Sequence, residues 1–385
     1  MRKTINIGDL GTIITGKTPP TTNKNYYGDY AVFIKPTDIS EQSKYTYETE
    51  EMYSKLAAEK YESSLIPKGA ICVPCIGTIG TKMTMTPCDC YTNQSINSII
   101  CNENYDNEYV YYLIKNFLPG LKAYNLGTAS GREYVSKSNF EKIELVAEQD
   151  QEIQKKIGII LSRYDSLIEN YQKQIKLLEE AAQRLYKEWF VDLHFPGHEN
   201  TKIVDGVPEG WEKKSVDSIY NIKYGKNLST KLITETGFYP VYGANGVIGY
   251  YDKANCNEQV VLITSRGNGS GDVLMTYHKD AFITNNSFIV TPSEGFEYCK
   301  LPFTFQFLKM ANFRAVRTGA AQPQLTNQSI HTVGVILPNK NLIEKFCSAT
   351  IGMNDTIIKY REQIRLLTEA RDRLLPKLMS GEITI

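Results

Sequence analysis

Three glycines at alternate positions, Gly267, Gly269 and Gly271, follow an apolar run in the second half of the chain. Glycine lets a backbone approach a ligand closely, so such a loop could bind a cofactor phosphate or S-adenosylmethionine if it opened a helix. The following residues, 273–276, read Val-Leu-Met-Thr and predict a strand instead. The corresponding stretch of the first half, residues 77–80, reads as a plain hairpin turn. We therefore interpret the three glycines as a turn between two strands.

Four cysteines fall close together in the first half and invite comparison with a zinc site: Cys72, Cys75, Cys88 and Cys90. Zinc requires thiolates that converge on one point. Cys72 and Cys75 lie in one apolar strand with Pro74 between them, so their side chains are expected on opposite faces. The second half has no matching cysteines. We interpret all four as buried or incidental thiols, which are ordinary in a reducing compartment.

The remaining candidates for catalysis are the four histidines, His194, His198, His278 and His331. None has a serine, cysteine or carboxylate at a spacing that indicates a catalytic triad. The chain also lacks the Asn/Asp-Pro-Pro-Tyr/Phe run of amino-methyltransferases, a Walker loop, and the paired acids plus lysine of nucleases. The sequence therefore predicts a protein without a catalytic site of its own.

Cationic and amide side chains gather on polar, glycine-bearing loops at corresponding places in both halves. These side-chain types hold phosphates and read base edges. Any one of them could be ordinary solvated surface, but as a recurring set they favour contact with DNA. The predicted DNA-binding residues are Lys82, Lys122, Asn125 and Arg132 in the first half and Arg266, Arg314, Arg317, Gln322 and Gln324 in the second.

A sequence repeat indicates the elements that must position these loops. Residues 171–185 and 360–374 match at nine of fifteen positions, at an offset of 189 residues. Repetition on this scale indicates a duplicated architecture. Strand and turn signals in residues 1–150 also recur in the same order in residues 211–340. Two domains of one fold with different surfaces suggest one task performed on two targets.

Both copies of the repeat carry apolar residues seven apart, which predicts a long helix that buries one side against another helix. In the first copy, Ile157 and Tyr164 begin one heptad position and Ile160 and Leu167 begin a second. The apolar stripe is widened by Leu161, Ile168, Ile175 and Ala182. Neither helix could hide its apolar stripe alone, so the two are expected to pack together and close the halves into a pseudo-twofold arrangement. The residues predicted for helix contact and partner docking are Tyr171, Ile175, Leu178, Leu185, Tyr360, Ile364, Leu367 and Leu374.

Length and composition place these elements in a soluble globular protein. The chain has 385 residues, of which 42% are hydrophobic and 22% charged, and its formal net charge is zero. No apolar run reaches the ~18 residues of a membrane span, and no signal core follows the N-terminus, so we expect a cytoplasmic protein. A net charge of zero provides no global attraction to nucleic acid, so any basic face must be local.

The predicted fold class is α+β, with two mixed, mostly β domains separated by two long antiparallel helices. The expected order is a first domain over residues 1–150, a central helix over 151–190, a linker and second domain over 191–340, and a C-terminal helix over 341–385. A helix of about forty residues is ~60 Å long at ~1.5 Å per residue.

Several segments resemble the specificity (S) subunits of type I restriction-modification enzymes, over essentially the whole chain. They are the repeated helix segments 171–185 and 360–374, Lys-Glu-Trp-Phe-Val at 187–191 with Phe-Pro-Gly at 195–197, Pro-Glu-Gly-Trp at 208–211, and the ending at 374–383. The first domain departs from this pattern, because it begins directly at a strand without a Pro-Glu-Gly-Trp lead.

The resemblance implies two target recognition domains, each reading half of a bipartite sequence in double-stranded DNA. It implies that the helix pair sets the spacer and docks two methyltransferase (M) subunits, and that restriction (R) subunits can join the complex. The chain itself would be non-catalytic, with S-adenosylmethionine, ATP and magnesium on the partner subunits. The alternatives are a self-contained DNA methyltransferase or nuclease, and a coiled-coil scaffold whose β domains bind protein.

Overall fold

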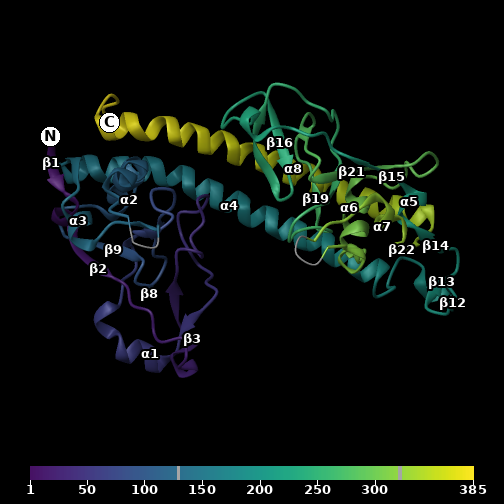
Figure 1. The fold of residues 1–385 in the computed structure, drawn as a ribbon, viewed down its shortest axis with the longest axis horizontal. Coiled ribbons are helices and arrows are strands. Elements are labelled where there is room, and N and C mark those ends of the chain that lie inside the picture. The colour runs from purple at the N-terminus through teal and green to yellow at the C-terminus, as the bar shows by residue number, and fades with distance from the viewer. Residues whose placement is uncertain (128–130, 320–322) are drawn as a thin grey trace. The chain divides into compact units, whose positions relative to one another are not determined.

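A computed structural model describes residues 1–127, 131–319 and 323–385 (Figure 1). The chain divides into two compact units, one made of Met1–Tyr171 with Gln363–Ile385 and the other of Gln172–Glu362. The two predicted long helices are confirmed as α4 (Gln151–Phe190) and α8 (Lys340–Ser380). Each unit therefore contains one mixed domain together with one segment of α4 and one segment of α8.

The domain of the first unit is built on a four-stranded antiparallel sheet in the order β2-β9-β5-β7 and a three-stranded sheet in the order β4-β3-β8. Its strands are β1 (Arg2–Asn6), β2 (Gly11–Thr15), β3 (Tyr27–Ile34), β4 (Met52–Tyr53), β5 (Ile71–Pro74), β6 (Ile76–Gly77), β7 (Thr84–Met85), β8 (Tyr91–Thr92), β9 (Ile96–Cys101), β10 (Glu133–Tyr134) and β11 (Glu144–Glu148). Its short helices are α1 (Lys55–Lys60), α2 (Asn107–Phe117) and α3 (Lys137–Glu141), with 3-10 turns η1 (Ile7–Leu10), η2 (Lys24–Tyr26), η3 (Glu62–Ser64) and η4 (Leu118–Tyr124).

The second unit repeats this design, with sheets in the orders β15-β21-β18-β19 and β17-β16-β20. Its strands are β12 (Ile203–Val204), β13 (Val207–Pro208), β14 (Glu212–Ser215), β15 (Tyr220–Tyr224), β16 (Tyr239–Gly243), β17 (Gly246–Tyr251), β18 (Val261–Thr264), β19 (Val273–Met275), β20 (Phe282–Ile283), β21 (Ser287–Pro292) and β22 (Gly334–Leu337). Its short helices are α5 (Val216–Ile219), α6 (Leu301–Met310) and α7 (Asn327–His331), with 3-10 turns η5 (His198–Asn200), η6 (Thr230–Leu232) and η7 (Phe313–Val316).

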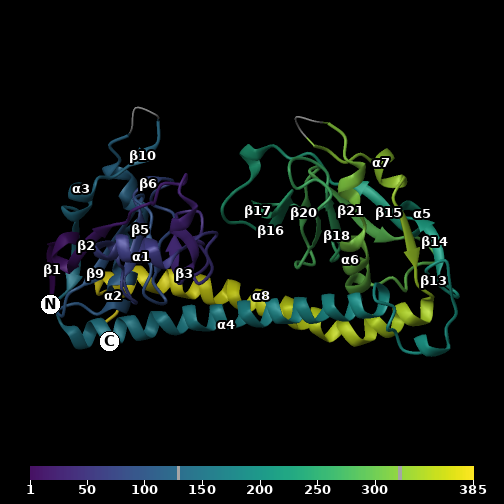
Figure 2. The same ribbon diagram turned by 90° about the horizontal axis from the view of Figure 1, so that it is seen from below.

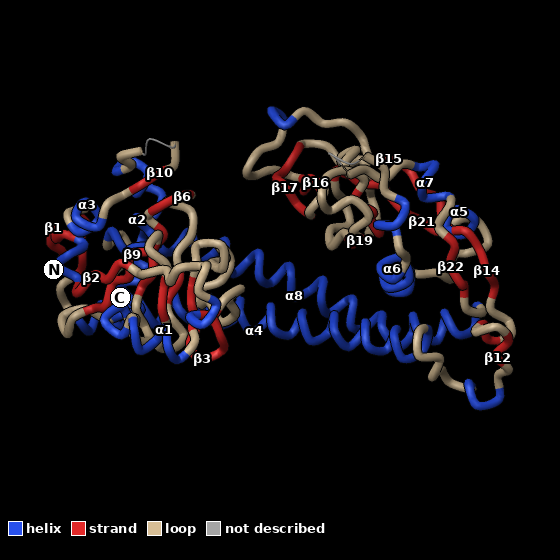
Figure 3. The backbone as a smooth tube through the Cα atoms, turned by 60° about the horizontal axis from the view of Figure 1, so that its bottom comes forward, coloured by secondary structure: helices blue, strands red, loops and turns tan. Residues whose placement is uncertain are grey.

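The match between the units extends to strand direction. In both three-stranded sheets one neighbour of the middle strand is antiparallel and the other is parallel. In both units the strand that enters the domain pairs antiparallel with the strand that leaves it, β1 with β11 and β14 with β22. Figure 3 shows the same mixture of short strands and loops in each unit. The predicted α+β class and the predicted duplication are confirmed.

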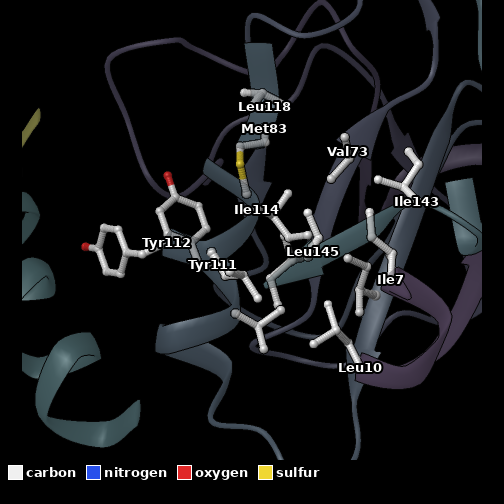
Figure 4. Close-up of a cluster of buried hydrophobic side chains, with 14 of the residues drawn as sticks. Ile7, Leu10, Val73, Met83, Tyr111, Tyr112, Ile114, Leu118, Ile143 and Leu145 are labelled. Atoms are coloured by element: carbon white, nitrogen blue, oxygen red, sulfur yellow. The ribbon is translucent and has the colours of Figure 1, made fainter. Parts of the chain in front are cut away.

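Helix α2 shows how the core of the first unit forms (Figure 4). The Asp106 side chain caps its N-terminus by accepting from the backbone N–H of Tyr109, which satisfies one of the free donors of a helix start. Six consecutive residues, 109–114, are buried, so the helix is covered on nearly all sides. Its side chains pack with residues of β5, β11 and η1, including Val73, Leu145 and Ile7.

The contact face of the long helices includes the predicted positions Leu161, Ile168, Ile175 and Ala182, but its register is completed by positions that were not predicted. Leu167, assigned to the apolar stripe, is 45% exposed. In α4 the face turned toward the protein consists of Gln154, Gly158, Leu161, Asp165, Ile168, Gln172, Ile175, Glu179, Ala182 and Tyr186. The residues 189 positions later form the same face of α8, from Ile343 to Leu375. Counting apolar residues misses this register because several positions of the face are polar and have partners.

One of these polar positions is Asp165, which is 4% exposed. Its carboxylate accepts from the Tyr112 hydroxyl of α2 and pairs with the Arg371 guanidinium of α8, which is 7% exposed. Burial, and next the Asp165 charge, raise the pKa of Tyr112, so the phenol stays protonated and donates. These contacts tie the domain to both long helices within the first unit.

The equivalent layer of the second unit has different chemistry. The residues 189 positions from Asp165 and Arg371 are Asn354 and Ala182, and both line a cavity of about 30 Å³ with Gln306 of α6. A second ion pair lies nearby in this unit, where Arg361 binds Glu179 at 2.9 Å and stacks over the Tyr277 ring at 3.7 Å. Each unit therefore joins its domain to its helices through an arginine, a carboxylate and a tyrosine. The positions of these residues along the helices are not equivalent in the two units.

Replacing Arg371 by alanine should destabilise the first unit by about 3–5 kcal/mol, because the buried Asp165 carboxylate would lose its cation. The double variant Asp165→Asn with Arg371→Ala should recover most of this loss, since it installs the residues of the equivalent second-unit layer. Calorimetric unfolding of the full chain measures both. Arg373→Ala is the control, because Arg373 pairs with Glu369 while 78% exposed, and should change stability by less than about 0.5 kcal/mol. Equal stability of Arg371→Ala and the wild type would contradict the role of the pair.

Candidate nucleic-acid interface

In the first unit, the predicted site is a cluster of backbone loops joined by hydrogen bonds. Strand β10 pairs with β6, which places the loop after η4 against the turn that follows β5. The backbone N–H of Leu126 donates to the Tyr134 carbonyl at 2.9 Å, and that of Val135 donates to Cys75 at 2.9 Å. Figure 2 shows β10 and β6 on the side of this unit away from α4 and α8.

The second unit builds the same cluster with different side chains. Arg266 and Gln324 form the bridge that corresponds to β6 and β10. The backbone N–H of Thr318 donates to the Gln324 carbonyl at 2.9 Å, and that of Leu325 donates to Ser265 at 2.7 Å. These bonds make Ile76 equivalent to Arg266, Asn125 to Arg317, Leu126 to Thr318, and Tyr134 to Gln324. The glycine-rich stretch is confirmed as the turn between the antiparallel strands β18 and β19.

Positive φ angles explain the glycines that recur in this cluster. Gly77 has φ +95° and Gly267 has φ +82°, and Gly127 and Gly319 are also in this range at +65° and +84°. Residues with a Cβ rarely adopt such angles. Glycine is therefore required here by the backbone path of the loops, and its recurrence says nothing about a ligand.

The structure brings three of the four predicted first-unit residues into the loop cluster, where Lys122, Asn125 and Arg132 are exposed. Lys82 lies just before β7 and is half-buried. Asn125 has a structural task, because its Oδ1 accepts from the backbone N–H groups of Gly127 and Tyr134 at 2.9 and 2.8 Å. These bonds hold the two ends of the loop together.

In the second unit, Arg266 and Gln324 are exposed and face each other across the loop. Arg314 is bound to Asp272 at 2.6 Å, so its charge is partly compensated. Gln322 lies outside the described residues.

Arg317 is the unusual member of this set. Its Nε and Nη2 atoms are buried and have no hydrogen-bond partner among residues 1–127, 131–319 and 323–385, although buried donors are normally paired. An acceptor pair such as guanine N7 and O6, or two phosphate oxygens, would satisfy both nitrogens.

Sequence reasoning missed one feature of the cluster, a Gly-Lys pair that ends the first strand of each main sheet. Lys17 follows β2 and Lys226 follows β15, and both side chains are exposed. Their backbone N–H groups donate to Thr92 and Ile283, both at 2.9 Å, in the turn beside the loop cluster. The signal was present, since a Gly-Lys dipeptide stands near the start of both domains, at 16–17 and at 225–226.

The four candidate cysteines are free thiols, and three of them are buried. Cys72 and Cys75 belong to different core clusters, which confirms that they point to opposite faces of their strand. Burial raises the pKa of both thiols to about 12. Within residues 1–127, 131–319 and 323–385, no three His, Cys, Asp or Glu side chains form a group that could hold a metal ion. Over the same residues, no helix is long and apolar enough to cross a membrane.

Comparison with known proteins also finds one domain family in two segments of the chain. The model of the family described as "Type I restriction modification DNA specificity domain" matches residues 2–180 and 208–361. The chain belongs to this family.

Individual relatives agree with this assignment. The chain is 27% identical to the type I restriction enzyme MjaIX specificity subunit of Methanocaldococcus jannaschii, over 98% of this chain and 93% of that protein. It is 37% identical to the HindI specificity subunit of Haemophilus influenzae over 41% of this chain and 35% of that one. The crystal structure of an S subunit from M. genitalium matches with a TM-score of 0.60 at 18% identity, over 98% of this chain and 96% of that one. This last likeness supports the fold.

Replacing Arg317 by methionine should weaken DNA binding while leaving the thermal stability of the chain unchanged or higher. The reason is that methionine keeps apolar contacts but removes two buried donors that lack acceptors, each of which costs about 1–3 kcal/mol. Calorimetry of the chain and titration of its methyltransferase complex with DNA measure the two quantities. A lower melting temperature with unchanged DNA affinity would instead assign Arg317 a structural role.

Proposed function

We propose that this chain is the specificity subunit of a type I restriction-modification complex and that each unit reads one half of a bipartite sequence in double-stranded DNA. The observation that carries the proposal is the paired loop cluster. Both units hold it with the same backbone hydrogen bonds, yet the side chains differ at equivalent positions, such as Asn125 and Arg317. A shared frame with different side chains suits two half-sites of different sequence, because bases are distinguished by side-chain donors and acceptors.

The long helices supply the second part of the proposed function, docking of two methyltransferase subunits and setting of the spacer between half-sites. Two copies of one partner need the same contacts twice. Leu177 on α4 and its repeat equivalent Leu366 on α8 meet this condition, since they are 64% and 43% exposed. A large apolar side chain exposed at the same place in both copies fits a surface that is covered in a complex.

We assign no catalytic role to the chain. S-adenosylmethionine, ATP and magnesium belong on the methyltransferase and restriction partners in this proposal, and restriction subunits are an optional third component. The loop clusters suit recognition instead, because they present arginine, lysine, asparagine and glutamine side chains, the types that contact phosphates and base edges.

Exchanging residues 211–340 for those of another specificity subunit should change one half of the methylated sequence and leave the other half as it was. This follows because the exchanged segment carries one loop cluster and leaves the first unit's domain intact. Mapping methylated adenines in cells that express the chimera with its methyltransferase partner measures the outcome. A chimera that still methylates the original bipartite sequence would contradict modular reading.

Replacing Leu177 or Leu366 by aspartate should each weaken binding of a methyltransferase subunit, and the double variant should abolish the full complex. Desolvating a carboxylate in an apolar contact is unfavourable. Native mass spectrometry of the purified proteins counts the bound subunits. Leu167→Asp is the matched control, because Leu167 is similarly exposed but its repeat equivalent is Thr356. Loss of subunits with Leu167→Asp alone would place the docking surface elsewhere.

A further inference from the structure

We infer that Lys17 and Lys226 bind equivalent backbone phosphates in the two DNA half-sites, and so position the loop clusters without reading sequence. This inference rests on the proposed function. It adds that some residues of the interface bind phosphates while others read bases. It comes from comparing the two units position by position, with hydrogen-bond register as the guide to which residues are equivalent.

The equivalence of the two lysines is set by the backbone around them. The N–H of Gly16 donates to Ile96, and that of Gly225 donates to Ser287 in the same place of the second unit. A Cβ on Gly16 would lie 2.1 Å from the Thr92 carbonyl oxygen, and one on Gly225 would lie 2.3 Å from that of Thr284. Both glycines are therefore required by packing, and each holds the following lysine in a defined place.

The lysines themselves have no such folding requirement. Both side chains are exposed. Over the described residues, neither ammonium group has an ion pair or a hydrogen bond. A charged side chain without a polar partner among the described residues, yet the same at equivalent places in two otherwise different sites, points to a ligand feature that both sites share.

The backbone bonds also place each lysine beside the loop cluster. The turn that accepts from Lys17 continues to Ser95, whose carbonyl accepts from Cys75, and Cys75 in turn accepts from Val135. In the second unit the same path runs from Lys226 through Asn286 and Ser265 to Leu325. A duplex in contact with the loops of either unit would therefore pass near its lysine.

Neighbouring positions in the cluster differ between the units in size, charge and hydrogen-bonding capacity. Ile76 corresponds to Arg266, Asn125 to Arg317, and Tyr134 to Gln324. Base edges differ between half-sites, so residues that read them must differ too. Phosphates are the same in every half-site, so one side chain can serve both. Lysine suits this task as a compact, flexible point charge.

The test uses the wild-type chain in complex with its methyltransferase subunits, with duplexes that contain the methylated sequence or a scrambled one. Lys17→Gln and Lys226→Gln should each weaken binding by the same factor on both duplexes. The plot of log affinity against log salt has a negative slope. Each variant should make this slope shallower by about 0.9, the value for one phosphate contact. The mapped methylation sequence should not change, and Lys17→Arg and Lys226→Arg should restore the slope. The double variant should lose about twice as much slope.

Lys213→Gln on β14 is the matched control, because Lys213 is exposed but outside the loop cluster, and it should leave the slope unchanged. An unchanged slope in Lys17→Gln and Lys226→Gln, or a changed base in the methylated sequence, would overturn the inference while the proposed function stood. A wild-type complex that methylates no bipartite sequence would overturn both.

Discussion

The contact faces of α4 and α8 are the constraint on which the rest of the molecule depends. Each helix carries a stripe that must leave water, and in each unit a segment of one helix is covered by a segment of the other and by the mixed domain. The stripe is not purely apolar. Asp165 and Arg371 lie in it, and a buried ion pair is stable only while both members and the Tyr112 hydrogen bond stay in place. The domain of the first unit is thus attached to its helices through Tyr112, Asp165 and Arg371, and Arg371 also pairs with Asp372 at 2.8 Å.

The two units show how one scaffold can serve two recognition tasks. Strand order, strand direction and the hydrogen bonds that hold the loop cluster recur, and so do the glycines that the backbone path requires. Side chains at the loop surface diverge between the two units. Asn125 and Arg317 illustrate the difference. They occupy equivalent places. The Asn125 Oδ1 atom accepts hydrogen bonds from its own loop, whereas Arg317 has two buried donor nitrogens without partners among the described residues.

Local pattern predicted much of this fold. The long helices, the β5–β7 and β18–β19 hairpins and the duplication all follow from apolar periodicity, glycine turns and a fifteen-residue repeat. The predicted apolar stripe included Leu161, Ile168 and Ile175, which are buried, but it also included Leu167, which is exposed. It left out Gln154 and Asp165, which are polar in sequence but buried in the structure. Periodicity counts apolar side chains, whereas burial depends on which polar groups find partners across the helix pair. The Gly-Lys pairs were missed for a related reason, since their equivalence depends on strand register.

The sequence by itself determined that the chain is a duplication, that its two mixed domains alternate with two long helices, and that its polar loops carry the residues suited to DNA. These conclusions rest on local propensity and on repetition, and both can be recognised from the order of residues alone. Only the tertiary structure decided which loop residues are neighbours, that Asn125 is committed to its own backbone, that Arg314 is paired with Asp272, and that Lys17 matches Lys226. Those facts arise from contacts between segments far apart in the chain, and the spacing of residues along a sequence does not record which segments meet.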